Sequence, residues 1–262
     1  TAGEGHAVTD AQYAAICRAF RAEMSGPDDH PMIGVISLSL GTIIERIETA
    51  RALGFRSFQL SLPSWGALND REMKVFFAET CGRFPDCQFL HYNLMRAKRL
   101  VTPAEYAELA ARHPNLVATK HGTKAPETIQ GLMRDAPMLT HFITEVGFAQ
   151  ACRLGESCGL LLSVSSTNLA LAREYYAAAK AGNTARVAAD AAELAAVIDI
   201  LIRNAEGVAH MDGAFDQVYS RMHLPEFPLR LLPPYASYDD ATYGKIIAEI
   251  RQRAPRWLPP GV

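Results

Sequence analysis

Short apolar runs alternate with helix-like patterns along much of this chain, and that alternation limits its fold more than any other feature. The strand-and-helix unit recurs about every 25 to 30 residues, an ordinary size for a βα unit. Regular alternation of this kind produces a parallel sheet with helices packed against it. Two architectures satisfy the pattern: an open doubly wound sheet and a closed (β/α)₈ barrel.

Six strands are predicted from the apolar runs, at residues 32–37, 55–62, 87–92, 116–120, 139–144 and 159–164. Helical patterns lie between them, at residues 41–53, 71–83, 126–134 and 148–154 and after the cap Thr102-Pro103. From Asn168 onward the pattern is helical, at residues 169–181, 184–204 and 239–253, with a proline-rich loop at 225–234. We therefore expect a barrel domain at residues 1–166 and packed carboxyl-terminal helices at 167–262.

The chain opens with Thr1-Ala2-Gly3-Glu4-Gly5, which has the composition of a loop at the end of a strand. The strand that such a loop would follow is not in the sequence. We therefore expect a strand, a helix and a second strand, about 40 residues in all, before Thr1. With them the strand count reaches eight, so the barrel is favoured over the open sheet.

Composition and charge exclude several classes of protein. The net charge is −2, with 26 basic and 28 acidic residues, so neither nucleic acid nor a membrane surface is an expected partner. The apolar stretches are far shorter than the roughly 20 residues of a membrane span, and the polar start is not a signal peptide. The five cysteines lack disulfide or metal-ligand spacing, which indicates reduced thiols in the cytoplasm. We expect neither a metal nor another cofactor.

Lys120 ends the apolar run Leu116-Val117-Ala118-Thr119 and is followed at once by His121-Gly122. A lysine aimed from a strand end into an enclosed pocket loses its proton more easily and attacks a carbonyl as a free amine. The simpler alternative is a surface lysine at the end of a strand. Tyr92 ends the preceding strand, where it is either a proton-transfer group or an amphipathic residue at the edge of the core.

In a barrel the carboxyl ends of all strands surround one site. That geometry places six residues around a common mouth: Thr1, Trp65, Tyr92, Lys120, Glu145 and Ser163. An amine and a phenol at such a site are suited to Schiff-base chemistry with a 2-oxo acid, because the iminium formed withdraws electrons from the adjacent carbon.

Several motifs together resemble the dihydrodipicolinate synthase / N-acetylneuraminate lyase family. They are Tyr92-Asn93 and Lys120-x-Gly122 at successive strand ends, Gly3-Glu4 closing an earlier strand, the last strand region at 159–168, and the segment at 228–234. The resemblance covers essentially the whole chain, and the Tyr–Lys spacing is its specific part.

The resemblance implies a (β/α)₈ barrel with added carboxyl-terminal helices, usually a homotetramer, that forms a Schiff base with pyruvate or a related 2-oxo acid. Lys120 would be the imine lysine and Tyr92 the proton relay. The partners would be small molecules: the 2-oxo acid and a second carbonyl compound.

The same resemblance implies how the substrate is held. Thr1 would link the tyrosine relay and lie beside the substrate carboxylate. Ala2 stands where a second threonine usually offers a hydroxyl, so only its backbone N–H remains for the anion. Leu162 and Ser163 match the backbone near the imine.

Three further positions depart from the family pattern. Trp65, in Pro63-Ser64-Trp65, stands where a tyrosine often reaches a neighbouring subunit; it either stacks on a substrate or fills a subunit contact. Arg96 is a candidate for gripping a second substrate's carboxylate, or a solvated loop arginine. Glu145 replaces a Gly-Asp-Asp pattern and is either a general base, a hydroxyl anchor or part of a structural ion pair. These departures argue against lysine biosynthesis and predict a divergent member.

Three functions remain open. The first is a class I aldolase, lyase or synthase acting on a 2-oxo acid through Lys120. The second uses the same imine to dehydrate or hydrate a 2-oxo-3-deoxy sugar acid, with Glu145 as the candidate base. The third is a ligand-binding barrel without catalysis, suggested by Ala2, Ser64 and Trp65 and opposed by the retained Tyr92 and Lys120.

Overall fold

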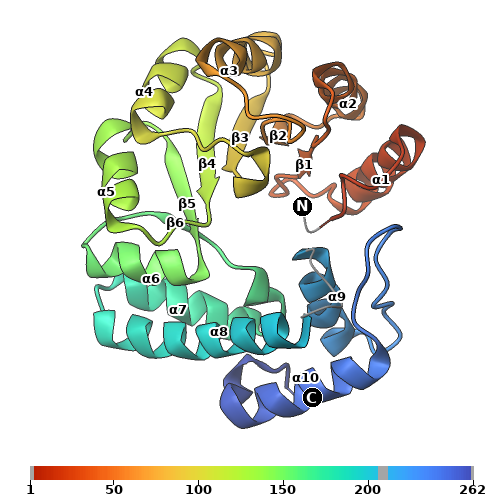
Figure 1. The fold of residues 1–262 in the computed structure, drawn as a ribbon, viewed down its shortest axis with the longest axis vertical. Helices are drawn as coiled ribbons and strands as arrows, with labels where there is room; N and C mark the ends of the chain where they lie inside the picture. Colours follow the sequence, from red (N-terminus) through yellow and green to blue (C-terminus); the bar gives the residue numbers. More distant parts are fainter. Residues whose placement is uncertain (1–2, 206–211, 261–262) are drawn as a thin grey trace. The chain divides into compact units, whose positions relative to one another are not determined.

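Six strands and ten α-helices run along the part of the chain that the computed structural model describes, residues 3–205 and 212–260 (Figure 1). The strands are β1 Met32–Gly34, β2 Ser57–Leu60, β3 Gln88–Asn93, β4 Leu116–His121, β5 Thr140–Thr144 and β6 Gly159–Leu161. The helices are α1 Asp10–Glu23, α2 Leu40–Ala52, α3 Asp70–Phe77, α4 Pro103–Arg112, α5 Pro126–Asp135, α6 Glu145–Arg153, α7 Leu169–Lys180, α8 Thr184–Ala205, α9 Asp212–His223 and α10 Asp240–Arg253.

The strands form one sheet in the order β1-β2-β3-β4-β5-β6. The pairs β1 with β2, β2 with β3, and β3 with β4 are parallel. A doubly wound sheet reverses its strand order at a switch point, whereas this sheet follows the chain without reversal, as barrel strands do. The predicted α/β fold with six barrel-type strands is therefore confirmed. Thr1 and Ala2, predicted in a strand-end loop, lie outside the described residues.

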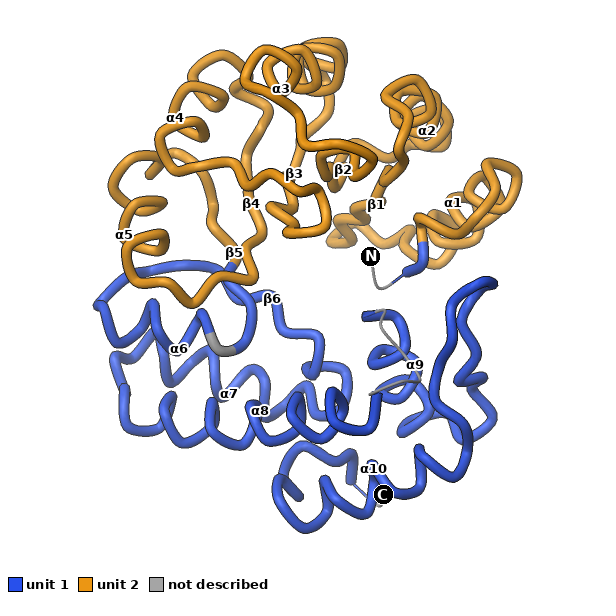
Figure 2. Tube along the Cα trace, viewed as in Figure 1, with its two compact units in different colours: residues 1–4, 143–262 blue, residues 5–142 orange. Residues whose placement is uncertain are grey.

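The chain divides into two compact units, shown in different colours in Figure 2. The N-unit comprises residues 5–142, and the C-unit comprises residues 1–4 and 143–262. Each is described by itself below. The domain boundary predicted after residue 166 marks the point where alternating strands and helices give way to helices alone. That boundary stays a prediction.

In the N-unit, helices α1 to α5 cover the outer side of the strands (Figure 1). Local signals start several of these helices. Asn69 and Glu72 form a reciprocal capping box at α3, and Thr102 and Glu105 form another at α4, where Pro103 occupies the first turn. The core between sheet and helices is aromatic-rich and fully buried; it includes Phe55, Phe58, Phe76, Phe77, Phe89 and Tyr106.

Several predicted elements end earlier than expected; the strands predicted at 32–37 and 55–62, for example, stop at Gly34 and Leu60. The helix predicted at 71–83 leaves the α-form at Phe77 and continues as a π-helix at Ala78–Gly82, where the Thr80 hydroxyl donates to the Phe76 carbonyl at 2.7 Å. The strand predicted at 159–164 stops at Leu161. The next residues form a 3₁₀ helix, Ser163–Ser166, in which both the backbone N–H and the hydroxyl of Ser165 donate to the Leu162 carbonyl.

In the C-unit, α8 packs against α6, α7 and α10. Its many alanine residues have small side chains, which leave room for these neighbouring helices. Asp190 on α8 is fully buried and accepts hydrogen bonds from Arg186 at 2.6 Å and from Arg256 at 3.0 Å, so the charge is paired on both sides. Helix α9 was not predicted as a separate element; α10 was.

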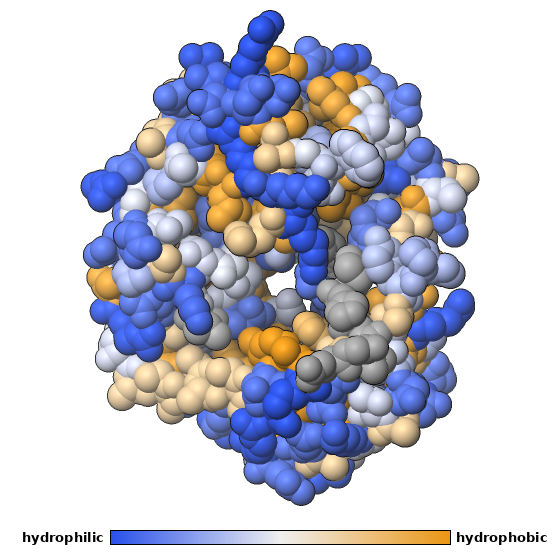
Figure 3. All heavy atoms as spheres, viewed as in Figure 1, coloured by the Kyte–Doolittle hydropathy of each residue, from blue (hydrophilic) through white to orange (hydrophobic). Residues whose placement is uncertain are grey.

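The face seen in Figure 3 is mostly hydrophilic, with hydrophobic residues in scattered patches. Within the described residues, no helix combines the length and the apolar character needed to cross a membrane. Large apolar side chains that are well exposed include Trp65 at 83% and Met95 at 74%.

Candidate active site

Tyr92 and Lys120 lie side by side at the carboxyl ends of β3 and β4. They are direct register partners in the parallel pair, and the Lys120 Nζ lies over the Tyr92 ring at 4.1 Å from its centroid. Both side chains are half-buried. The sequence predicted that these residues end adjacent strands; the structure adds that they share one face of the sheet and touch.

The neighbours of this pair point to the opposite face, because successive side chains of a strand alternate. His91, Thr119 and His121 are buried there against the helices. Desolvation lowers the pKa of His91 to about 3 and that of His121 to about 3. These histidines are therefore neutral at physiological pH and belong to the core.

The loops after β2 and β3 are joined near Trp65. The Lys98 Nζ donates to the backbone carbonyl of Trp65 at 2.8 Å, while the Trp65 side chain itself is largely exposed. Arg96 lies in the 3₁₀ helix Met95–Ala97 directly after β3 and is exposed. Both candidates thus lie on loops that follow the carboxyl ends of strands, where a (β/α) fold carries its variable residues.

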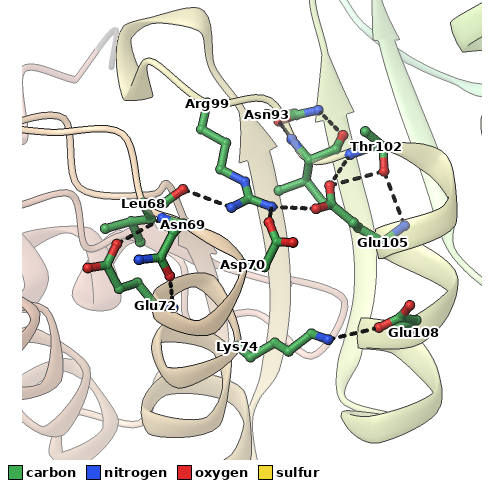
Figure 4. A network of polar contacts seen from close by, with 11 residues as sticks. Leu68, Asn69, Asp70, Glu72, Lys74, Asn93, Arg99, Thr102, Glu105 and Glu108 are labelled. Carbon is green, nitrogen blue, oxygen red and sulfur yellow. Dashed lines mark hydrogen bonds and ion pairs between the residues drawn. The ribbon is translucent and has the colours of Figure 1, made fainter.

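Arg99 holds the same two loops together (Figure 4). Its guanidinium donates to the Leu68 carbonyl at 2.8 Å, to Asp70 at 2.8 Å and to Glu105. Asp70 begins α3 and Glu105 lies in the first turn of α4. The largely buried side chain of Arg99 therefore binds the first turns of both helices. The sequence analysis did not single out Arg99; its only signal was its place between a strand end and a capping box.

Two candidates of the C-unit contact each other. The backbone N–H of Ser163 donates to Glu145 Oε1 at 2.9 Å, which joins the start of α6 to the loop after β6. Leu162 is half-buried and precedes the 3₁₀ helix; Ser163 is exposed. The structure therefore brings Glu145 and Ser163 together, and it gives Glu145 a structural contact beside any catalytic role.

Two motifs of the family resemblance also meet in the C-unit. The Glu4 carboxylate accepts a hydrogen bond from the backbone N–H of Leu232 at 2.7 Å, so the Gly-Glu motif binds the proline-rich segment. The proposed carboxylate-binding residues Thr1 and Ala2, which precede it, lie outside the described residues. Among residues 3–205 and 212–260 there is no group of three or more His, Cys, Asp or Glu side chains arranged to hold a metal ion.

No protein-family model and no curated protein matches the chain by sequence. Solved structures do match in fold. Dihydrodipicolinate synthase from Cyanidioschyzon merolae, with lysine bound, superposes with a TM-score of 0.81 at 17% identity, covering 97% of this chain and 84% of that one.

Two further structures are similar to the same degree. N-acetylneuraminate lyase from Proteus mirabilis gives a TM-score of 0.80 at 15% identity, covering 97% of this chain and 84% of the lyase. A prophage protein of the dihydrodipicolinic acid synthase family from E. coli, in complex with pyruvate, gives 0.78 at 15% identity, with 94% and 82% covered. The chain therefore has the fold of the dihydrodipicolinate synthase / N-acetylneuraminate lyase family, as the resemblance of its motifs predicts.

Proposed function

We propose that this chain is a Schiff-base enzyme that acts on pyruvate or a closely related 2-oxo acid. One observation carries the proposal: Lys120 and Tyr92 are register partners whose amine and aromatic ring are in contact at the carboxyl ends of adjacent strands. Both side chains are half-buried, so the amine lies in a partly desolvated place, which favours its free, nucleophilic form.

In the proposed mechanism the Lys120 nitrogen attacks the substrate's keto carbon, and the keto oxygen leaves as water after it has gained two protons. The C=N⁺ bond then accepts the electron pair released when a proton leaves the adjacent carbon or when the next C–C bond breaks. Tyr92 moves the proton in each of these steps. Thr1, the backbone of Ala2, and the backbone at Leu162 and Ser163 would hold the carboxylate and the imine region.

A carbon–carbon lyase or aldolase is our first choice for the outcome. Dehydration or hydration of a 2-oxo-3-deoxy sugar acid is the second candidate, because Glu145 is a carboxylate directly after a strand. The Ser163 N–H bond holds this carboxylate in one orientation, which suits a hydroxyl anchor as well as a base. The barrel without catalysis is the third.

Borohydride trapping tests the proposal without knowledge of the second substrate. The protein is incubated with pyruvate and with other 2-oxo acids, reduced, and examined by intact mass and peptide mapping. We expect a reduced adduct on Lys120 and none in Lys120→Ala. Lys124→Ala is the matched control, because Lys124 is an exposed lysine of the same strand-end loop. If no 2-oxo acid labels the wild-type protein, the non-catalytic barrel replaces this proposal.

The assembly and location are also part of the proposal. A homotetramer is expected from the family resemblance, with Trp65 in a subunit contact. A cytoplasmic location fits the five cysteines, all of which are free thiols.

A further inference from the structure

Lys120 is bracketed in the sequence by two side chains that are anchored on the opposite face of the sheet. Thr119 precedes it and His121 follows it, with relative exposures of 0% and 2%. Both contribute to one hydrogen-bonded chain that reaches β5: His121 Nε2 meets Thr119 Oγ1 at 2.8 Å, and Thr119 Oγ1 meets His141 Nδ1 at 2.7 Å. Lys120 therefore lies between two buried side chains that are bonded to each other, and Thr119 ties them to β5.

The contact of His141 with the Ala136 carbonyl determines which atom donates in each hydrogen bond of this series. His141 Nε2 lies 2.9 Å from the Ala136 carbonyl, which only accepts, so Nε2 carries the hydrogen and donates. In a neutral imidazole Nδ1 then accepts, so the Thr119 hydroxyl donates to His141 and accepts from the Nε2–H of His121. Thr119 has one hydroxyl proton, and this arrangement uses it once. A single arrangement therefore satisfies all three hydrogen bonds.

Tyr92 is bracketed in the same way. His91 precedes it and meets the Tyr106 hydroxyl of α4 through Nδ1 at 2.6 Å. Asn93 follows it and binds the backbone of Val101 through both ends of its amide, at 2.8 and 2.9 Å. Tyr92 thus sits between two residues that bind other segments of the N-unit, and Lys120 follows a residue that binds β5.

Buried polar chains are a costly way to fill a core. An apolar replacement of both partners of a buried hydrogen bond is often neutral for stability, whereas a satisfied polar chain restricts the fold to one geometry. Here the polar residues stand in the two strands that carry Tyr92 and Lys120, at the positions next to them. A Schiff-base reaction needs such restriction, because the amine, the keto carbon and the phenol must be aligned closely.

We propose that Thr119, His121 and His141 are positioning residues, which hold the end of β4 so that Lys120 meets its substrate in a reactive orientation beside Tyr92. This inference rests on the proposed function. It assigns these residues no contact with substrate; they act through the backbone of Lys120.

The test compares two buried threonines of the N-unit. Thr119→Val removes the central hydroxyl of the chain, and Thr80→Val removes a hydroxyl that is equally buried and makes a 2.7 Å bond to Phe76, away from the catalytic pair. Thr119→Ser restores the hydroxyl. The rate of exchange of the pyruvate methyl protons in D₂O, followed by ¹H NMR, reports imine formation and proton removal together, whatever the second substrate.

We expect Thr119→Val to lower kcat for exchange about tenfold or more, with KM for pyruvate nearly unchanged, because a small misplacement of a reacting group is costly. Thr119→Ser should recover most of the rate, and Thr80→Val should keep it. The histidines give a readout independent of variants: ¹⁵N NMR of the wild-type protein should show neutral Nε2–H tautomers for His121 and His141.

Three outcomes decide the matter. Wild-type exchange together with a Thr119→Val rate within about twofold of Thr80→Val would overturn the positioning role but leave the Schiff-base function in place. Nδ1–H tautomers at His121 and His141 would overturn it even if Thr119→Val does not fold. Absence of any wild-type adduct or exchange would overturn the proposed function, and this inference with it.

Discussion

Asn93 binds Val101 twice: its Nδ2 donates to the Val101 carbonyl at 2.8 Å, and its Oδ1 accepts from the Val101 N–H at 2.9 Å. This pair closes the loop that follows β3, one residue after Tyr92. The same loop carries Arg96 and the lysine that binds the Trp65 carbonyl. The candidate proton relay is thus adjacent to a loop that this side-chain amide helps to close.

Replacement of Asn93 by Leu should open this loop. Two part-buried hydrogen bonds are lost and the Val101 backbone is left partly unsatisfied, so we expect a loss of about 1–3 kcal/mol in the free energy of unfolding, measured with urea. Pyruvate exchange should slow as well. Asn115→Leu is the control. Asn115 directly precedes β4, at the end opposite to Lys120, and its amide donates to the backbone carbonyls of Cys81, Phe84 and Cys87. Equal exchange rates in the two variants would contradict a role for the loop.

Removal of the Tyr92 hydroxyl should separate imine formation from proton transfer. In Tyr92→Phe the ring that Lys120 Nζ faces remains, so borohydride should still trap pyruvate on Lys120. Exchange of the methyl protons should fall on the order of 10²-fold or more, because a positioned proton-transfer group is missing. Undiminished exchange in Tyr92→Phe would reject Tyr92 as the relay.

The buried histidines predict a loss of stability in mild acid. Burial lowers the folded-state pKa of His91 and His121 to about 3 and lowers that of His141, against about 6.5 in the unfolded chain. Below about pH 6.5 the unfolded state therefore binds more protons, and stability falls as pH falls. From pH 7 to pH 5 we expect a decrease of roughly 2 kcal/mol for each strongly shifted histidine, measured as the urea midpoint.

Two variants check which histidines cause this loss. The double variant His91→Leu with Tyr106→Phe replaces both partners of a buried hydrogen bond, so it should fold and should lose less stability between pH 7 and pH 5 than the wild type. His30→Gln changes an exposed histidine and should leave the pH dependence as it is. An unchanged pH dependence in the double variant would show that His91 does not contribute.

A substitution of Trp65 should show whether this residue serves subunit assembly or substrate binding. Its side chain is 83% exposed in the single chain, which is unusual for a large aromatic residue and suits a protein contact. Sedimentation velocity at micromolar concentration should show a tetramer, and Trp65→Ala should shift it to smaller species. Unchanged assembly combined with a raised KM for the carbonyl partner would assign Trp65 to the substrate instead.

Local chemistry in the sequence determined the fold class and the candidate pair. Alternating strands and helices, the caps at Asn69 and Thr102, and a lysine and a tyrosine at successive strand ends are all visible within a few neighbouring residues, and each was confirmed as structure. The role of the pair in catalysis remains a prediction.

Only the tertiary structure decided which residues meet. The register that sets Tyr92 opposite Lys120 includes a shift between Phe89 and Leu90, and such an irregularity cannot be read from strand ends. The hydrogen bond between Thr119 and His141 and that between Arg99 and Leu68 join residues that lie 22 and 31 positions apart. Sequence patterns report the period of one element, whereas these contacts depend on how strands align and how side chains fill the space between them.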